Sequence, residues 1–287
     1  MNSRVAKAMS LLRTLWVISR PAGLPTVWSN CLAGWWLGGH QNSNALPLVL
    51  VSATLLYLGG GLLNDVFNAE FDKAHHPERP LPSGVISWKV VWRCGLVLLA
   101  LGALLLFGAG TFTASLGLCL VVCIVLFNAL HRVTPWSSVL LGMCRLFVYL
   151  LGASVSEHSL AGWPVWGGIA VAAYVCGVAL FRPQNLWPII LLACPVALAV
   201  VMDAGPYREG GLLLSAVFVL WTLMSFRQSL WAQEPNLPKT MSGLLAGIVL
   251  VDWVAVADAP RAFSFIFLAL FGTSLILRKR PACSRGL

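Results

Sequence analysis

Long apolar runs recur along the whole chain, separated by short stretches that contain Gly, Pro, Asn or charged residues. Most runs approach the roughly 20 helical residues that cross a hydrocarbon core of about 30 Å. Because one segment can be re-entrant or lie at the interface, the pattern predicts an all-α, polytopic transmembrane helical bundle of nine to ten helices. The candidate segments are 19–39, 46–66, 90–109, 112–130, 137–155, 163–181, 185–203, 211–230, 241–258 and 261–278.

The composition indicates that lipid is the solvent of this chain. Hydrophobic residues make up 59% of the 287 residues and charged residues only 10%. These are too few charges for the surface of an ordinary water-soluble protein. No stretch is long and polar enough to form a separate soluble domain. We therefore expect a single membrane-embedded domain over residues 1–287, surrounded by the lipid bilayer.

The basic residues are distributed unevenly between the two predicted sides of the membrane. The chain has 19 Lys and Arg residues against 10 Asp and Glu residues. With a cytoplasmic N-terminus, most of the basic residues fall on the cytoplasmic side, Arg208 and Arg261 fall on the opposite side, and Arg145 lies inside a segment. This asymmetry predicts that both termini are cytoplasmic, and we expect a bacterial cytoplasmic (inner) membrane. No basic patch is interleaved with aromatic residues in a polar loop, so we expect no nucleic-acid partner.

The one densely polar stretch of the sequence lies between the second and third segments, at residues 64–84. Asp65, Asn68 and Asp72 are spaced by three and four residues, so they share one face of a helix that extends from the second segment. Oxygen ligands of this kind suit Mg²⁺, which proteins hold with one or two carboxylates together with substrate phosphates. The alternative interpretation is a charged loop that only caps two helices.

This stretch resembles the first aspartate-rich motif of the UbiA superfamily of intramembrane prenyltransferases, N-D-x-x-D-x-x-x-D, followed by R-P-L-P-S-G. Asn64, Asp65 and Asp72 match the motif, and residues 79–84 match the sequence that follows it. Asn68 stands where the family has its middle aspartate. This departure removes one anionic ligand, although an amide oxygen can still coordinate a metal ion.

Three further stretches are similar to the same family. Arg20 and Pro21 precede the first segment, and Asn30 lies within it, as in the family's opening motif. The sequence FNALHRVTPW at residues 127–136 resembles the loop between the fourth and fifth helices, with Arg132 matched and His131 at a position where Lys is usual. Arg145 matches the arginine of the fifth helix.

The superfamily's second aspartate-rich motif is missing, because residues 178–190 contain no carboxylate. The chain is therefore most similar to UbiA-like members, associated with secondary-metabolite gene clusters, that keep only the first motif. The GIVLVD stretch at residues 247–252 agrees with this subgroup.

The resemblance implies an enzyme that transfers a prenyl group from an allylic isoprenyl diphosphate to an unidentified acceptor within the membrane. It implies Mg²⁺ as the cofactor and an active site that faces the cytoplasm. Asp65, Asp72 and Arg132 would be catalytic, and Asp65, Asn68 and Asp72 would hold the metal ion. The substrate-binding residues would be Asn64, Asn68, Arg79, Lys73, Arg145, Asn30 and His131.

Two other functions remain open at this stage: an isoprenoid-binding protein without catalysis, and a secondary transporter with an intramembrane Arg and Asp. For Arg145 itself there are also two interpretations, a functional residue that faces a cavity or a structural partner of Asp252. His75 and His76 are adjacent, so they do not share a helical face and are expected to be solvated loop residues.

Overall fold

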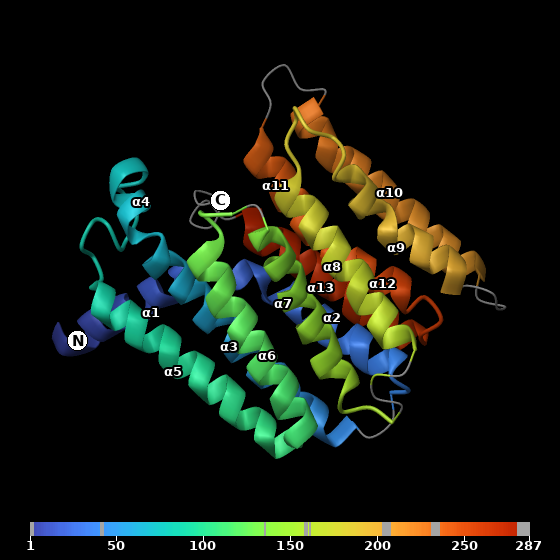
Figure 1. Cartoon of the computed structure of the whole chain (residues 1–287), viewed down its shortest axis with the longest axis horizontal. Coiled ribbons are helices and arrows are strands. Elements are labelled where there is room, and N and C mark those ends of the chain that lie inside the picture. Colours follow the sequence, from blue (N-terminus) through green and yellow to red (C-terminus); the bar gives the residue numbers. More distant parts are fainter. Residues whose placement is uncertain are drawn as a thin grey trace.

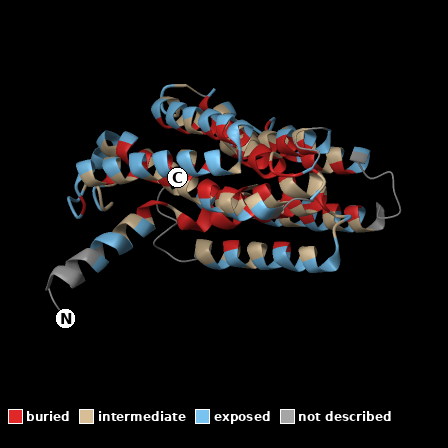
Figure 2. Ribbon diagram, turned by 90° about the horizontal axis from the view of Figure 1, so that it is seen from below, coloured by how far each residue is buried: buried red, intermediate tan, exposed pale blue. Residues whose placement is uncertain are grey.

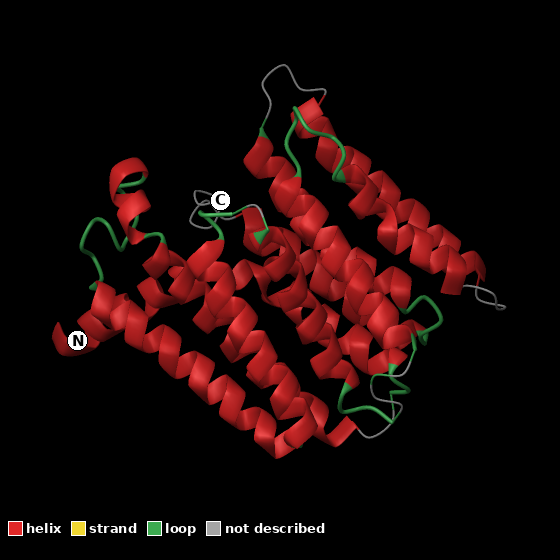
Figure 3. Cartoon of the chain, in the orientation of Figure 1, coloured by secondary structure: helices red, strands yellow, loops and turns green. Residues whose placement is uncertain are grey.

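The computed structural model describes residues 3–40, 43–134, 136–157, 160, 162–202, 208–230 and 236–279. All regular elements among these residues are helices, as predicted, and Figure 3 shows no strand. The elements are α1 Ser3–Ile18, η1 Pro21–Gly23, α2 Leu24–Leu37, η2 Ser43–Ala45, α3 Leu46–Phe67, α4 Ala69–His75, α5 Trp88–Leu106, η3 Phe107–Ala109, α6 Thr111–Leu130, α7 Ser137–Ala153, α8 Trp163–Leu180, α9 Ile189–Met202, α10 Arg208–Leu230, α11 Leu237–Ala246, α12 Ile248–Ala255 and α13 Arg261–Lys279.

Seven helices among the described residues are long and apolar enough to cross a membrane, with α11 and α12 counted together because they follow each other directly. The shorter apolar helices α7 and α9 lie beside them, and α2 has 14 residues, as many as α9. Each of the ten predicted segments therefore corresponds to a helix or to the α11–α12 pair. The polytopic helical bundle is confirmed. Helix α1, which was not among the predicted segments, precedes the bundle.

The helices α2 and α7 lie at the centre of the bundle, where α2 packs against α3, α8, α12 and α13, and α7 packs against α6 and α8. Helix α5 forms one edge and α9 with α10 forms the opposite edge (Figure 1). Buried residues concentrate where the helices face one another, and the outward faces carry exposed residues (Figure 2). Many of those exposed residues are large and apolar, such as Leu104, Leu213 and Phe265. This is the expected surface for contact with lipid.

Two glycines allow the backbones of α2 and α7 to approach closely. A Cβ atom at Gly34 would lie 2.0 Å from the carbonyl oxygen of Tyr149, and one at Gly152 would lie 2.0 Å from the carbonyl oxygen of Cys31. Small residues at helix interfaces are a common means of close packing in membranes. The contact is important for function because α2 carries Asn30 and α7 carries Arg145.

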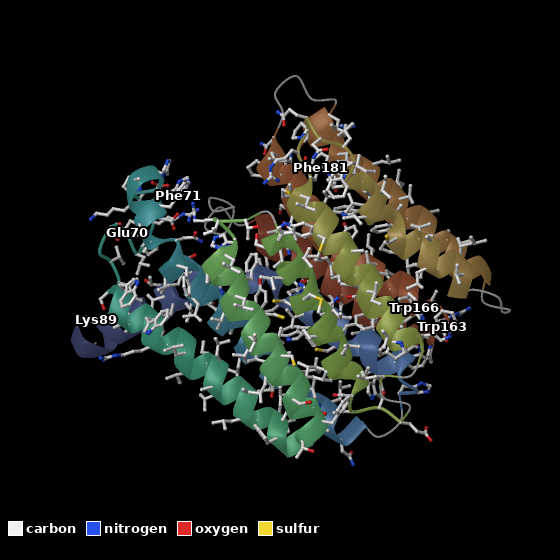
Figure 4. All side chains as sticks on the ribbon, viewed as in Figure 1. Glu70, Phe71, Lys89, Trp163, Trp166 and Phe181 are labelled. Carbon is white, nitrogen blue, oxygen red and sulfur yellow. The ribbon has the colours of Figure 1, made fainter. Side chains whose placement is uncertain are left out.

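The polar connections gather at one end of the bundle. Helix α4, the C-terminal end of α6 and the C-terminal end of α13 lie on the same side in Figure 1. Glu70 and Phe71 mark this end in Figure 4, whereas Trp163 and Trp166 lie at the opposite end of α8 from Phe181. The exposed indole rings of Trp163 and Trp166 agree with a role as interfacial anchors.

Candidate active site

The predicted aspartate-rich face is formed by the end of α3 and the start of α4. The helix ends at Phe67, but the backbone amide of Asn68 still donates to the carbonyl of Asn64 (3.0 Å), and that of Asp72 donates to the carbonyl of Asn68 (2.9 Å). The helical spacing therefore continues through the junction. Asp65, Asn68 and Asp72 are all buried, so the structure brings the three predicted metal-binding residues together on one face.

Asp72 is held by the loop that follows α4. The Nη1 atom of Arg79 donates to Oδ2 of Asp72 over 2.7 Å. The other carboxylate oxygen, Oδ1, is buried and has no hydrogen-bond partner among the described residues. Because an unsatisfied buried acceptor is costly, this oxygen is a position where a bound cation would be favourable.

Asp65 is paired with Arg20, a residue that was not predicted as part of the site. The Nη2 atom of Arg20 lies 3.0 Å from Oδ1 of Asp65, and the hydroxyl of Tyr57 donates to the carbonyl of Arg20 (3.1 Å). Arg20 has a left-handed backbone conformation, with φ of 58°, which is unfavourable for a residue with a side chain. The sequence signal was the Arg20-Pro21 motif itself, which we interpreted as a helix entrance only.

The loop between α6 and α7 closes over Asn68. The His131 Nε2 atom lies 2.9 Å from Oδ1 of Asn68, and Nε of Arg132 donates to the same oxygen. Burial lowers the pKa of His131, the hydrogen bond to the backbone carbonyl of Asn128 opposes this shift, and the neighbouring Arg132 adds to it. The guanidinium of Arg132 also lies over the ring of Phe71, 3.5 Å from its centroid.

Asn64 joins the same network from the inner side. Its amide donates to Oδ1 of Asn128 (2.9 Å), and the amide of Asn68 donates to Oδ1 of Asn64 (3.2 Å). Asn128, on α6, was not predicted from the sequence. The structure therefore brings together most of the predicted site residues at the polar end of the bundle, namely Asn64, Asp65, Asn68, Asp72, Arg79, His131 and Arg132.

The predicted residues Asn30 and Arg145 belong to a second, deeper cluster. The Nη1 atom of Arg145 donates to Oδ1 of Asn30 (3.2 Å). The amide of Asn30 donates to both carboxylate oxygens of Asp252 (3.0 and 2.8 Å), and the hydroxyl of Ser29 donates to Oδ2 of Asp252 (2.5 Å). Neither of the two interpretations weighed for Arg145 foresaw this arrangement, in which Asn30 lies between the two charged groups.

Three other predicted positions lie at the margin of the site. Lys73 is exposed on α4. His75 stacks on Phe71, with ring centroids 3.9 Å apart, whereas His76 lies 3.6 Å from Glu78. The two histidines therefore face different partners, but His75 is the last residue of α4 rather than a loop residue, so the expectation of two loop histidines is wrong for His75.

The segment where the second aspartate-rich motif was expected provides no acidic group. Phe181 is fully buried, and Arg182 donates to the carbonyls of Ala179 (3.2 Å) and Phe181 (2.6 Å). The described part of the chain contains no cluster of three or more His, Cys, Asp or Glu side chains that could hold a metal ion. The oxygen atoms that would hold a hard cation are those of Asp65, Asp72 and Asn68, although the Asn68 oxygen already accepts a hydrogen bond from Arg132. The unpaired Asp72 Oδ1 suits a Mg²⁺ ion that substrate phosphates help to hold.

The comparisons with known proteins decide the family. Residues 22–187, more than half of the chain, match the UbiA prenyltransferase family. This chain belongs to the UbiA prenyltransferase family. A digeranylgeranylglyceryl phosphate synthase from Ignicoccus hospitalis is 30% identical over 260 residues, which are 89% of this chain and 76% of that protein. Another from Sulfolobus acidocaldarius is 32% identical over 125 residues, 44% of this chain and 40% of that protein.

Solved structures agree on the fold of this UbiA-family chain. A UbiA homolog from Aeropyrum pernix has a TM-score of 0.62 at 17% identity, covering 86% of this chain and 98% of that chain. A homolog from Archaeoglobus fulgidus, bound to GPP and Mg²⁺, has a TM-score of 0.52 at 12% identity, covering 93% of this chain and 100% of that chain. The family match, the relative from Ignicoccus hospitalis and the candidate membrane spans together make this chain a multi-pass membrane prenyltransferase, as the resemblance implied. The comparisons give no support to the transporter and non-catalytic alternatives.

Proposed function

We propose that this chain transfers a prenyl group from an allylic isoprenyl diphosphate to a glycerol phosphate lipid, with help from Mg²⁺, at the end of the bundle formed by α4 and the α6–α7 loop. The observation that carries the proposal is the buried Asp72 carboxylate, which has one oxygen on Arg79 and the other without a partner. Asp65 and Asn68 lie on the same face. Positive side chains surround these oxygen ligands, which is the arrangement that a diphosphate bound through a metal ion requires.

The reaction breaks the bond between C1 of the prenyl group and the diphosphate oxygen, and pyrophosphate leaves with the electron pair. Negative charge grows on the leaving group, so a preorganised positive environment accelerates the step. Mg²⁺, held by Asp65, Asn68 and Asp72, would neutralise part of that charge. Arg79 and Arg132 present planar guanidinium groups that match phosphate oxygens. A new bond from the acceptor to C1 completes the transfer, and the acceptor loses a proton.

The choice of acceptor rests on the relatives. Both curated relatives described above are named for a product in which two geranylgeranyl groups are attached to glyceryl phosphate. We infer that the acceptor of this chain likewise carries a phosphate. These relatives are archaeal, so the expectation of a bacterial inner membrane gains nothing from them. The uneven distribution of basic residues still supports a site that faces the cytoplasm.

Removal of Mg²⁺ is expected to lower pyrophosphate release about 100-fold or more, since the two carboxylates would then face an unneutralised diphosphate. The measurement is pyrophosphate release from geranylgeranyl and farnesyl diphosphate by the purified protein in lipid nanodiscs, with an excess of chelator and then with Mg²⁺ restored. Release that is equal with and without Mg²⁺ would contradict the proposed metal role. Mg²⁺-dependent binding of the diphosphates without any release, even with the acceptor present, would contradict catalysis.

Replacement of Asn68 by aspartate restores the family's middle acidic residue and is expected to lower the Mg²⁺ concentration needed for half-maximal release. The new carboxylate would keep its contacts with His131 and Arg132 and would add a negative charge beside the metal position. It loses the hydrogen bond to Asn64, which limits the gain to about tenfold. A Mg²⁺ titration of Asn68→Asp and Asn68→Ala checks this, because the alanine variant should shift the midpoint in the opposite direction.

A further inference from the structure

Arg145 is the middle residue of α7, within the bundle and far from either end of its helix. Its side chain is partly exposed, although a charged group at this depth in a membrane is costly unless it is paired or faces a cavity. A guanidinium group has five N–H donors. Among the contacts of the described residues, Nη1 alone donates a hydrogen bond, to Asn30. The remaining donors are available to a ligand.

The charge of Arg145 is compensated without use of those donors. Asp252, on α12, is fully buried and accepts hydrogen bonds from Ser29 and Asn30. Asn30 directs its amide toward Asp252 and its carbonyl oxygen toward Arg145. The negative charge is therefore held one side chain away from the guanidinium. This arrangement stabilises an arginine inside the membrane and leaves most of its guanidinium N–H donors without a partner among the described residues.

Arg145 is separate from the proposed diphosphate site. Among the described residues it forms no hydrogen bond or ion pair with Asp65, Asn68 or Asp72, which are instead bound by Arg20, Arg132 and Arg79. Tyr57 lies between the two groups, because its ring centroid is 5.9 Å from Cζ of Arg145 and its hydroxyl donates to the carbonyl of Arg20. Arg145 and Arg20 are thus both next to Tyr57, one at its ring and the other at its hydroxyl.

We propose that Arg145 is the binding residue for the phosphate of the acceptor, and that Asn30 and Asp252 act as its positioning residues. The proposal rests on the function proposed above. It assigns the phosphate of the acceptor to Arg145, apart from the arginines that bind the donor diphosphate. A planar guanidinium with open donors matches phosphate oxygens through two parallel hydrogen bonds. The donor diphosphate binds at the first aspartate-rich motif, next to Arg79 and Arg132. Because Tyr57 contacts both Arg145 and Arg20, the acceptor phosphate would be held close to the donor diphosphate.

The test compares two probes that differ only in the phosphate: geranylgeranylglyceryl phosphate and geranylgeranylglycerol. Binding is measured in nanodiscs without diphosphate or Mg²⁺, so the result does not depend on catalysis or on the first motif. The intact chain is expected to bind the phosphorylated probe at least tenfold more tightly. Arg145→Gln should abolish most of this preference and leave binding of the alcohol unchanged. Arg145→Lys, which keeps the positive charge but lacks the planar guanidinium group, should retain an intermediate preference.

Arg93→Gln is the matched control, because Arg93 is exposed on α5 and should leave both affinities unchanged. Equal binding of the two probes by the intact chain would overturn the proposal without any variant. A preference that survives in both Arg145 variants would overturn it as well. In a separate assay with geranylgeranyl diphosphate and Mg²⁺, weaker binding of that diphosphate by Arg145→Gln, with the preference between the two probes unchanged, would place the residue in the donor site instead. Pyrophosphate release by the intact chain, measured separately, tests the proposed function independently.

Discussion

The replacement of Asp72 by asparagine is expected to lower pyrophosphate release about 100-fold or more. The variant keeps the size of the side chain but removes the charge that faces both Arg79 and the proposed metal position. Loss of one preorganised electrostatic group commonly costs 100-fold to 1,000-fold in turnover. Asp72 is the more informative of the two aspartates, because its Oδ1 is buried and without a partner. The measurement is the initial rate of pyrophosphate release at saturating diphosphate, over a range of Mg²⁺ concentrations.

Glu78→Gln provides the control for Asp72→Asn. Glu78 is also acidic and close in sequence, but it is exposed, and its ion-pair partner is His76. Its substitution should change the rate less than twofold. A rate for Asp72→Asn within a factor of three of the unchanged chain would show that the first motif is not where the diphosphate is ionised. A Mg²⁺ midpoint that stays constant while the rate falls would assign Asp72 to the positioning of Arg79 alone.

The sequence predicted the helices well because membrane-spanning segments need long apolar runs, and these are visible without tertiary information. It also predicted that Asp65, Asn68 and Asp72 share a face. That prediction is confirmed because the backbone hydrogen bonds of Asn68 and Asp72 carry the helical spacing through the break after Phe67. A sharper kink at Asn68 would have moved Asp72 to another face.

The deeper cluster was less predictable, for a physical reason. A direct pair between Arg145 and Asp252 is the simplest guess when only the charged residues of a sequence are considered. The observed arrangement depends on Asn30, whose amide group satisfies both charges at once. Arg20 was missed for a similar reason, since its contact with Asp65 spans 45 positions of the sequence. Helix α1 was missed because its basic residues interrupt the apolar pattern.

The replacement of Gly152 by alanine is expected to destabilise the bundle by about 3 kcal/mol or more. The added Cβ would lie 2.0 Å from the carbonyl oxygen of Cys31 and 2.7 Å from its carbonyl carbon. Both are backbone atoms of α2, so no side-chain rotation can relieve the overlap, and overpacking of this kind is costly. At roughly 2–4 °C per kcal/mol for a chain of this size, the thermal midpoint in detergent should fall by about 6 °C or more.

Gly272→Ala is the matched control, because Gly272 lies in α13 and a Cβ there would meet nothing within 4 Å. It should leave the midpoint unchanged or raise it slightly, since alanine favours a helix over glycine. If Gly152→Ala is as stable as Gly272→Ala, then α2 and α7 are not in backbone contact. The hydrogen bond between Asn30 on α2 and Arg145 on α7 would then lack its structural support. Destabilisation by Gly152→Ala alone would show that the close contact between α2 and α7, the helices that carry Asn30 and Arg145, stabilises the fold.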